Sequence, residues 1–286
     1  MNKIVLIVGN GFDLDLGWKT SYSDFASNDK FWPFKYAEDS SNSLSGYLNN
    51  HKEIDTWFDM ESCLGEYAKL DADRPVDKVL LTEDKRDYDA LVNKLKQYLE
   101  KEQDKELNKD SFAYNILNQF RRTTMRPCVY SFNYTDPFRQ LHGNIDVNYM
   151  HGSLKDDNII LGMDGNSKIK EGYTFLRKTY NPKYRANNIK EDLKVANIIF
   201  IFGLSFGLLD YEYFKEYFMS LKYPSGNKTN RCWIITKDNG SRYKLLENIR
   251  EMCGDMDTLN QNNDFNVICK DSSRDLINRM LRDLEV

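Results

Sequence analysis

The stretch that decides the fold is IVLIVGNGFD, residues 4–13. Its first half, Ile4–Val8, is an unbroken run of Ile, Leu and Val, which is typical of a strand buried on both faces in a parallel sheet. A strand that ends in G-x-G and leads into a helix places backbone N–H groups and the positive helix end at one point, where phosphate is the usual ligand. We therefore expect a nucleotide-binding loop made of Gly9, Asn10, Gly11, Phe12 and Asp13.

The same pattern also fits a tight strand-to-helix turn without a ligand. Asp13 is unusual beside a phosphate, because two negative charges repel each other. We expect its carboxylate to bind a ribose hydroxyl or to cap the following helix.

Five further segments have the apolar composition of core strands, and helical patterns separate them. They are residues 128–132, 148–150, Ile198–Phe202, 232–236 and, more weakly, 265–269. Parallel strands that alternate with helices predict an α/β fold, a Rossmann-like parallel sheet flanked by helices.

Two long gaps interrupt the predicted sheet. Residues 26–110 contain no convincing strand and include a charged amphipathic helix at 88–107, so they predict a large helical insertion after the first strand. Residues 156–189 predict a smaller loop insertion, and the Asn-rich residues 255–264 predict a surface loop. We expect residues 1–286 to form a single Rossmann-like domain that carries both insertions.

The composition narrows the class of protein. The net charge of −4 and the pI of about 5.6 argue against nucleic acid as the main partner. The N-terminus has no signal-peptide pattern, and no apolar run approaches the ~20 residues of a membrane span, so we expect a cytoplasmic protein that does not enter a membrane. The five cysteines form no close pair, so we expect reduced thiols and no bound metal.

Polar residues follow the later strands as well, at the sheet edge where ligands of open α/β sheets bind. Asn133, in the segment 131–136, suits a ribose diol or a water, and Asp136 is a second candidate, although both also suit helix capping. Gly203 and Ser205 follow the most apolar strand and are candidate ligand contacts. Asp210 is expected to cap the next helix, 211–221.

His151 is the candidate acid or base. It follows the predicted strand 148–150 and precedes Gly152, and histidine ionises near neutral pH. The alternative is a structural histidine bonded to backbone. Of the other two histidines, His51 lies in the helical insertion and His142 in a predicted helix. The block Trp57-x-Asp59-x-Glu61 either lines the cleft or belongs to an ordinary helix with one buried Trp.

The motifs resemble a known family. The strand, the sequence GNGFDLDLG and the following TSYSDF resemble the N-terminal signature of the AbiH family of bacteriophage abortive-infection proteins. The resemblance continues, in the same order, through residues 57–61, FNYT at 132–135, HGS at 151–153 and the segment 203–210.

At longer range, the order of glycine loop, Asn and His-Gly resembles the sirtuin-like NAD-binding fold. This resemblance implies that Gly9 and Gly11 hold phosphate, that Asn133 lies at the ribose and that His151 is catalytic. Asn10 stands where sirtuins have Ala, and the zinc-binding cysteine pairs are missing. The resemblance therefore implies the zinc-free, NAD-consuming branch used in antiphage defence rather than protein deacetylation.

Three functions remain open at this point. The first is an antiphage hydrolase that cleaves NAD or a related nucleotide at the N-glycosidic bond, without a tightly bound cofactor. The second is a non-catalytic module that senses a nucleotide and switches a homo-oligomer or a partner such as a phage-derived trigger. The third is a scaffold that uses the acidic helical insertion as its contact surface.

Overall fold

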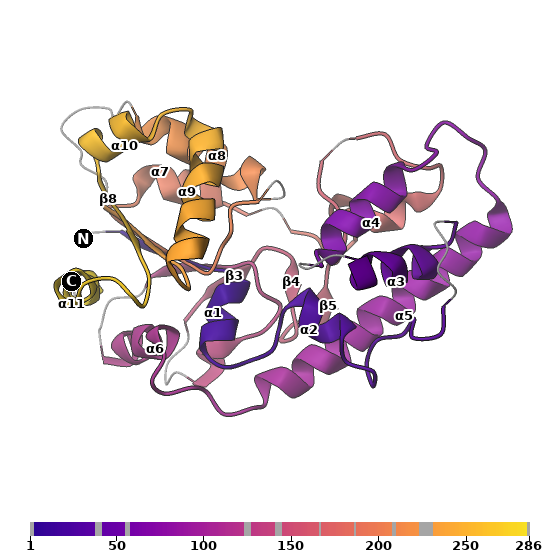
Figure 1. Cartoon of the computed structure of the whole chain (residues 1–286), viewed down its shortest axis with the longest axis horizontal. Coiled ribbons are helices and arrows are strands. Elements are labelled where there is room, and N and C mark those ends of the chain that lie inside the picture. Colours follow the sequence, from indigo (N-terminus) through magenta and orange to yellow (C-terminus); the bar gives the residue numbers. More distant parts are fainter. Residues whose placement is uncertain are drawn as a thin grey trace. The chain divides into compact units, whose positions relative to one another are not determined.

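The computed structural model describes residues 3–37, 42–54, 58–122, 127–140, 145–165, 167–185, 187–207, 210–222 and 231–284. They form two compact units (Figure 1). Unit 1 comprises Met1–Trp18, Glu106–Met150 and Ala186–Val286, and unit 2 comprises Lys19–Lys105 and His151–Arg185. Unit 2 thus consists of the two predicted insertions, with bounds shifted by a few residues. A single domain with insertions stays a prediction.

Unit 1 contains a six-stranded sheet in which every pairing is parallel. Its strands are β1 (Ile4–Val8), β2 (Cys128–Ser131), β3 (Val147–Tyr149), β6 (Ile198–Phe202), β7 (Arg231–Ile235) and β8 (Asp264–Ile268). The order across the sheet is β3-β2-β1-β6-β7-β8, that of a doubly wound, Rossmann-type sheet. All six predicted strands are confirmed, with bounds that differ by at most one residue.

Side chains alternate along each strand, so the sheet buries both faces. On one face, Val5 and Ile7 of β1 belong to the core that the sheet forms with α7 (Ile189–Val195), α8 (Tyr211–Leu221), α9 (Asn239–Cys253) and α10 (Met256–Asn262). On the other, Leu6 and Val8 belong to the core formed with α1 (Asn10–Asp15), α6 (Phe112–Arg122) and α11 (Arg274–Asp283). The unit is therefore a three-layer α/β/α structure.

Unit 2 is mainly helical in its described residues, as predicted. It contains α2 (Tyr22–Ala26), α3 (Leu44–Ile54), α4 (Met60–Lys69) and α5 (Lys78–Gln103), the short strands β4 (Gly152–Ser153) and β5 (Asn158–Ile159), and the 3-10 helices η2 (Tyr173–Leu176) and η3 (Lys178–Tyr180). The long charged helix is confirmed but starts ten residues earlier than expected. Within the described part of the chain, no helix has the length and apolar character that crossing a membrane requires.

One local prediction is wrong, and a second is confirmed only in position. Residues 255–264 are not a loop, because Asp255 caps α10 by accepting hydrogen bonds from the backbone of Asp257 and Thr258. Asp210 does stand at the N-terminal cap of α8, but its side chain makes no capping hydrogen bond. The predictions for His142 and Trp57 lie outside the described residues.

A buried carboxylate organises unit 2. Asp84 of α5 is fully buried and accepts hydrogen bonds from the backbone of Leu44 (2.8 Å) and from the hydroxyls of Tyr67 (2.5 Å) and Tyr173 (2.7 Å). Burial and the neighbouring Asp84 raise the pKa of both tyrosines, so the phenols remain donors at neutral pH. One side chain on α5 thereby connects α3, α4 and η2.

We expect Asp84→Ala to lower the free energy of unfolding by about 3 kcal/mol or more, because it removes the acceptor that three donors share, and of these Tyr67 keeps a second, longer bond to the Asn42 carbonyl (3.3 Å). Urea unfolding measures the loss. Glu83→Ala removes an exposed carboxylate from the same helix and should change stability by less than about 0.5 kcal/mol. Equal losses in the two variants would contradict this role for Asp84.

Candidate functional site

The turn from β1 into α1 contacts the loop that follows β6 in unit 1. Of the five residues predicted to form a glycine loop, only Gly9 precedes the helix, because Asn10, Gly11, Phe12 and Asp13 already belong to α1. The Gly9 N–H donates to the Phe202 carbonyl (2.8 Å), and the Gly11 N–H donates to the Gly203 carbonyl (3.0 Å). A Cβ on Gly11 would lie 2.6 Å from the Gly203 Cα, and a Cβ on Gly203 would lie 2.4 Å from the Phe12 nitrogen. Gly203 also has a φ of +74°, which favours glycine. These glycines are thus required for loop-to-loop packing, whether or not a ligand binds.

A buried carboxylate fixes the first loop to the segment after β2. Asp13 is 1% exposed. Its two oxygens accept hydrogen bonds from the Asn133 amide (2.9 Å) and from the Thr135 hydroxyl. The Asn133 amide also donates to the Gly9 carbonyl (2.9 Å). Asn133 therefore holds both ends of the glycine loop, and the amide nitrogen that we expected at a ribose or a water makes these internal bonds.

Other predicted residues divide between core and surface. Phe12 is fully buried among core aromatics, with its ring centroid 5.1 Å from that of Phe202, and its N–H donates to the Gly9 carbonyl. The structure thus places its side chain in the core rather than at a ligand surface. Asp136 accepts a hydrogen bond from the Phe138 N–H (3.1 Å) at the start of η1 (Pro137–Gln140), which is the capping alternative. Asn10 and Gly11 are half-buried, and Ser205 is exposed.

The loop after β6 contains a strained residue. Phe206 is 2% exposed and has a φ of +54°, a left-handed conformation that is rare for a bulky side chain. Such a conformation costs about 1–3 kcal/mol and persists only where the surroundings enforce it. Phe206 packs edge-on against Phe214 and Phe218 of α8, and these contacts hold the loop in place.

His151 lies in unit 2, at the start of the segment that forms β4 and β5. It is 7% exposed, and its carbonyl accepts a hydrogen bond from the Ile160 N–H (2.9 Å). In the same unit, the fully buried Lys178 ammonium donates to Glu61 (2.9 Å) and Asp164 (3.2 Å). Asp59, two residues before Glu61 in the sequence, caps the N-terminus of α4.

Burial dominates the ionisation of this group of residues. It lowers the pKa of His151 well below the ordinary value of 6.5, and the Lys178 charge lowers it further. Burial also raises the pKa of Glu61, an effect that Lys178 opposes. Although burial lowers the pKa of Lys178, its two carboxylate partners outweigh this and raise it above 10.5. At neutral pH, His151 is therefore uncharged beside a charged lysine.

Three residues of these contacts were not predicted from the sequence: Thr135, Asp164 and Lys178. Thr135 was within a quoted segment, whereas Asp164 and Lys178 lie in the predicted loop insertion and belong to no motif. The role of Lys178 depends on its contact with Glu61, 117 residues earlier in the chain, and that of Asp164 depends on its contact with Lys178. In the part of the chain that the structure describes, no group of three or more His, Cys, Asp or Glu side chains is arranged to hold a metal.

We expect Gly203→Ala to lower the free energy of unfolding by at least about 2 kcal/mol, because its Cβ would meet the Phe12 backbone. The matched control is Gly207→Ala in the same loop. There the nearest atom to a new Cβ is the Ser205 hydroxyl, at an ordinary 3.7 Å. Thermal or urea unfolding distinguishes the two, and unchanged stability of Gly203→Ala would contradict the packing.

The lowered pKa of His151 predicts a pH dependence of stability. Below pH 6.5 the unfolded chain takes up a proton on this residue that the folded chain does not, so stability falls as the pH falls. The loss amounts to at most about 1.4 kcal/mol per pH unit, and it ends at the folded-state pKa. Urea unfolding between pH 7 and pH 5 should show a flatter profile for His151→Gln than for the wild type. Parallel profiles would contradict the buried, neutral histidine.

Comparison with known proteins identifies the family of this chain. No match to the chain is found among curated proteins. A solved structure described as "Structural Basis for the Mechanism and Regulation of Sir2 Enzymes" is similar over 89% of this chain and 94% of that one, with 13% identity and a TM-score of 0.36. The strand order, not this similarity, defines the fold. Residues 5–229 match the model of the family described as "Bacteriophage abortive infection AbiH". Because that match spans most of the chain, the protein belongs to the AbiH family.

Proposed function

We propose that this protein binds an NAD-like dinucleotide at the switch point of the sheet in unit 1 and hydrolyses its N-glycosidic bond during phage infection. One observation carries the binding proposal. The chain leaves β1 into α1 on one face of the sheet and leaves the neighbouring β6 toward α8 on the other. In doubly wound sheets, such a reversal opens a crevice beyond the strand ends, and dinucleotides bind there.

The polar groups at this position support a nucleotide ligand. The half-buried Asn10 begins α1 directly after β1, and the exposed Ser205 lies on the loop after β6, so one ligand that crosses the switch point would meet both. The N–H groups of Gly9, Gly11 and Phe12 donate within the protein. We therefore assign phosphate recognition to the side chains and the other backbone amides of the segments after β1 and β6. The glycines set the conformation of these segments.

Cleavage of a nicotinamide–ribose bond produces a ribose cation and a neutral leaving group. The leaving group needs no acid, but the attacking water must lose a proton. The sirtuin-like order of the sequence motifs is the reason for assigning this step to His151, whose lowered pKa keeps the imidazole neutral and able to accept a proton. Asn133 is a positioning residue in this proposal, since its amide fixes the loop that holds the ligand.

We expect His151→Ala to lower the rate of nicotinamide release at least about a hundredfold, the lower bound of a general base's contribution. The affinity for NAD, measured by calorimetry, should change less than about threefold. His51→Ala is the matched control, because His51 is partly exposed on α3 and bonds only its own helix in the contacts described. Wild-type turnover by His151→Ala would remove this residue from the mechanism.

A specific observation favours the second function, a nucleotide sensor without turnover. Asp13 and Asn133, the acid and amide at the switch point, are engaged with each other. Binding of NAD without nicotinamide release, in the presence and absence of phage lysate, would support the sensor. A change of oligomeric state upon binding would identify its output.

A further inference from the structure

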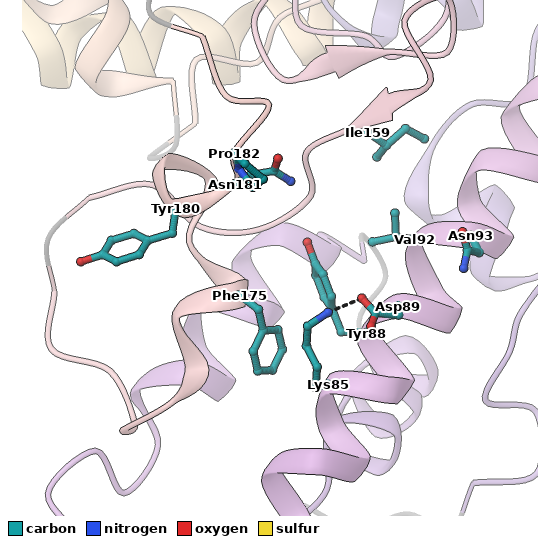
Figure 2. A pocket seen from close by; sticks show the side chains of 10 residues that line it. All are labelled: Lys85, Tyr88, Asp89, Val92, Asn93, Ile159, Phe175, Tyr180, Asn181 and Pro182. Atoms are coloured by element: carbon teal, nitrogen blue, oxygen red, sulfur yellow. Dashed lines mark hydrogen bonds and ion pairs between the residues drawn. The ribbon is translucent and has the colours of Figure 1, made fainter.

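Unit 2 contains a cavity of about 560 Å³ that the proposed function does not use. It lies between α5 and the segment that includes η2 and η3, and its volume is in the range of small-molecule sites. Figure 2 shows Lys85, Tyr88 and Asp89 of α5 on one side and Phe175 of η2 facing them. Val92 and Ile159 add apolar surface.

The groups that meet in this cavity are those that recognise a positive charge. The Lys85 ammonium lies 5.5 Å from the ring centroid of Tyr88 and 5.5 Å from that of Phe175. It also forms an ion pair with Asp89, one helical turn later (Figure 2). Two aromatic rings and a carboxylate thus surround one ammonium group, which the chain itself supplies.

The Lys85 ammonium is held weakly in this cavity. Its side chain is 44% exposed, and that of Asp89 is 55% exposed. Exposed ion pairs of this spacing contribute little, because solvent screens them and the long side chain loses conformational freedom. Water can solvate the ammonium again if Lys85 rotates away. A ligand that brings its own cation therefore displaces Lys85 at little cost.

We propose that this cavity binds a small organic ammonium ion, about the size of choline, in place of the Lys85 ammonium. The ligand's positive group lies over the Tyr88 and Phe175 rings, whose centroids are 5.3 Å apart, and beside Asp89. Its alkyl part contacts Val92 and Ile159. The proposed function uses none of these residues, so the proposal does not rest on it.

The test titrates the full-length protein with choline and with 3,3-dimethylbutan-1-ol, which has the same shape without the charge, at constant ionic strength. Calorimetry or ligand-observed NMR gives the dissociation constants. We expect choline to bind about tenfold more tightly than the alcohol. We expect Lys85→Ala to bind choline about three- to tenfold more tightly than the wild type, because the competing cation is gone.

Two variants should have the opposite effect. Phe175→Leu and Asp89→Asn each remove one partner of the cation and should weaken choline binding about three- to tenfold. Lys101→Ala is the matched control, since Lys101 is a lysine of the same helix whose ammonium lies over the Phe31 ring, outside the cavity. It should leave the affinity unchanged.

The proposal fails if neither the wild type nor Lys85→Ala binds choline, or if choline and the alcohol bind equally. It also fails if Lys85→Ala and the conservative Lys85→Gln both weaken binding, because Lys85 would then help the ligand rather than compete with it. Circular dichroism and urea unfolding of each variant confirm that the helix is retained. Loss of NAD turnover in any variant does not bear on this test.

Discussion

The bond between Asp13 and Asn133 is the constraint on which the arrangement at the switch point depends. A carboxylate that is 1% exposed is costly unless its oxygens are hydrogen-bonded. Asn133 and Thr135 supply those bonds from the segment after β2. Since the same Asn133 amide also holds the Gly9 carbonyl, the glycine loop has its position set by the neighbouring strand rather than by its own turn.

This constraint gives the sequence motifs of unit 1 a common physical basis. Gly11, after β1, packs on Gly203, after β6. Asp13 accepts a hydrogen bond from Asn133, after β2, and Phe12 is buried in the core. A pattern of glycine, asparagine and aspartate after the strands therefore indicates segments that pack on one another, whether or not a ligand binds. The loops have to be rigid before any ligand can be held at a defined place.

The strands of the sheet could be predicted from the sequence, but the contacts at the candidate site could not. The reason is that a buried strand has a local pattern, whereas these contacts join residues far apart in the chain. A strand such as Ile198–Phe202, buried on both faces, is apolar throughout and is visible in isolation. The role of Asn133 depends on a partner 120 residues away, and no local pattern carries that information. Asp255 was misjudged for a related reason, because Asn-rich composition suggested a loop while the aspartate was a helix cap.

The two hypotheses for the function make different demands on His151. A general base is most effective when its pKa lies near the working pH, yet burial and Lys178 hold this imidazole well below it. A sensor has no such requirement, because a neutral buried histidine can be purely structural. An enzyme that uses this histidine as a base needs a state in which the pKa of the imidazole is higher. Less burial of the ring, or a weaker electrostatic effect of Lys178, would raise that pKa. Since Lys178 is held by both Glu61 and Asp164, changes in that buried group of charges would alter the basicity of His151 without changing any residue at the switch point of unit 1.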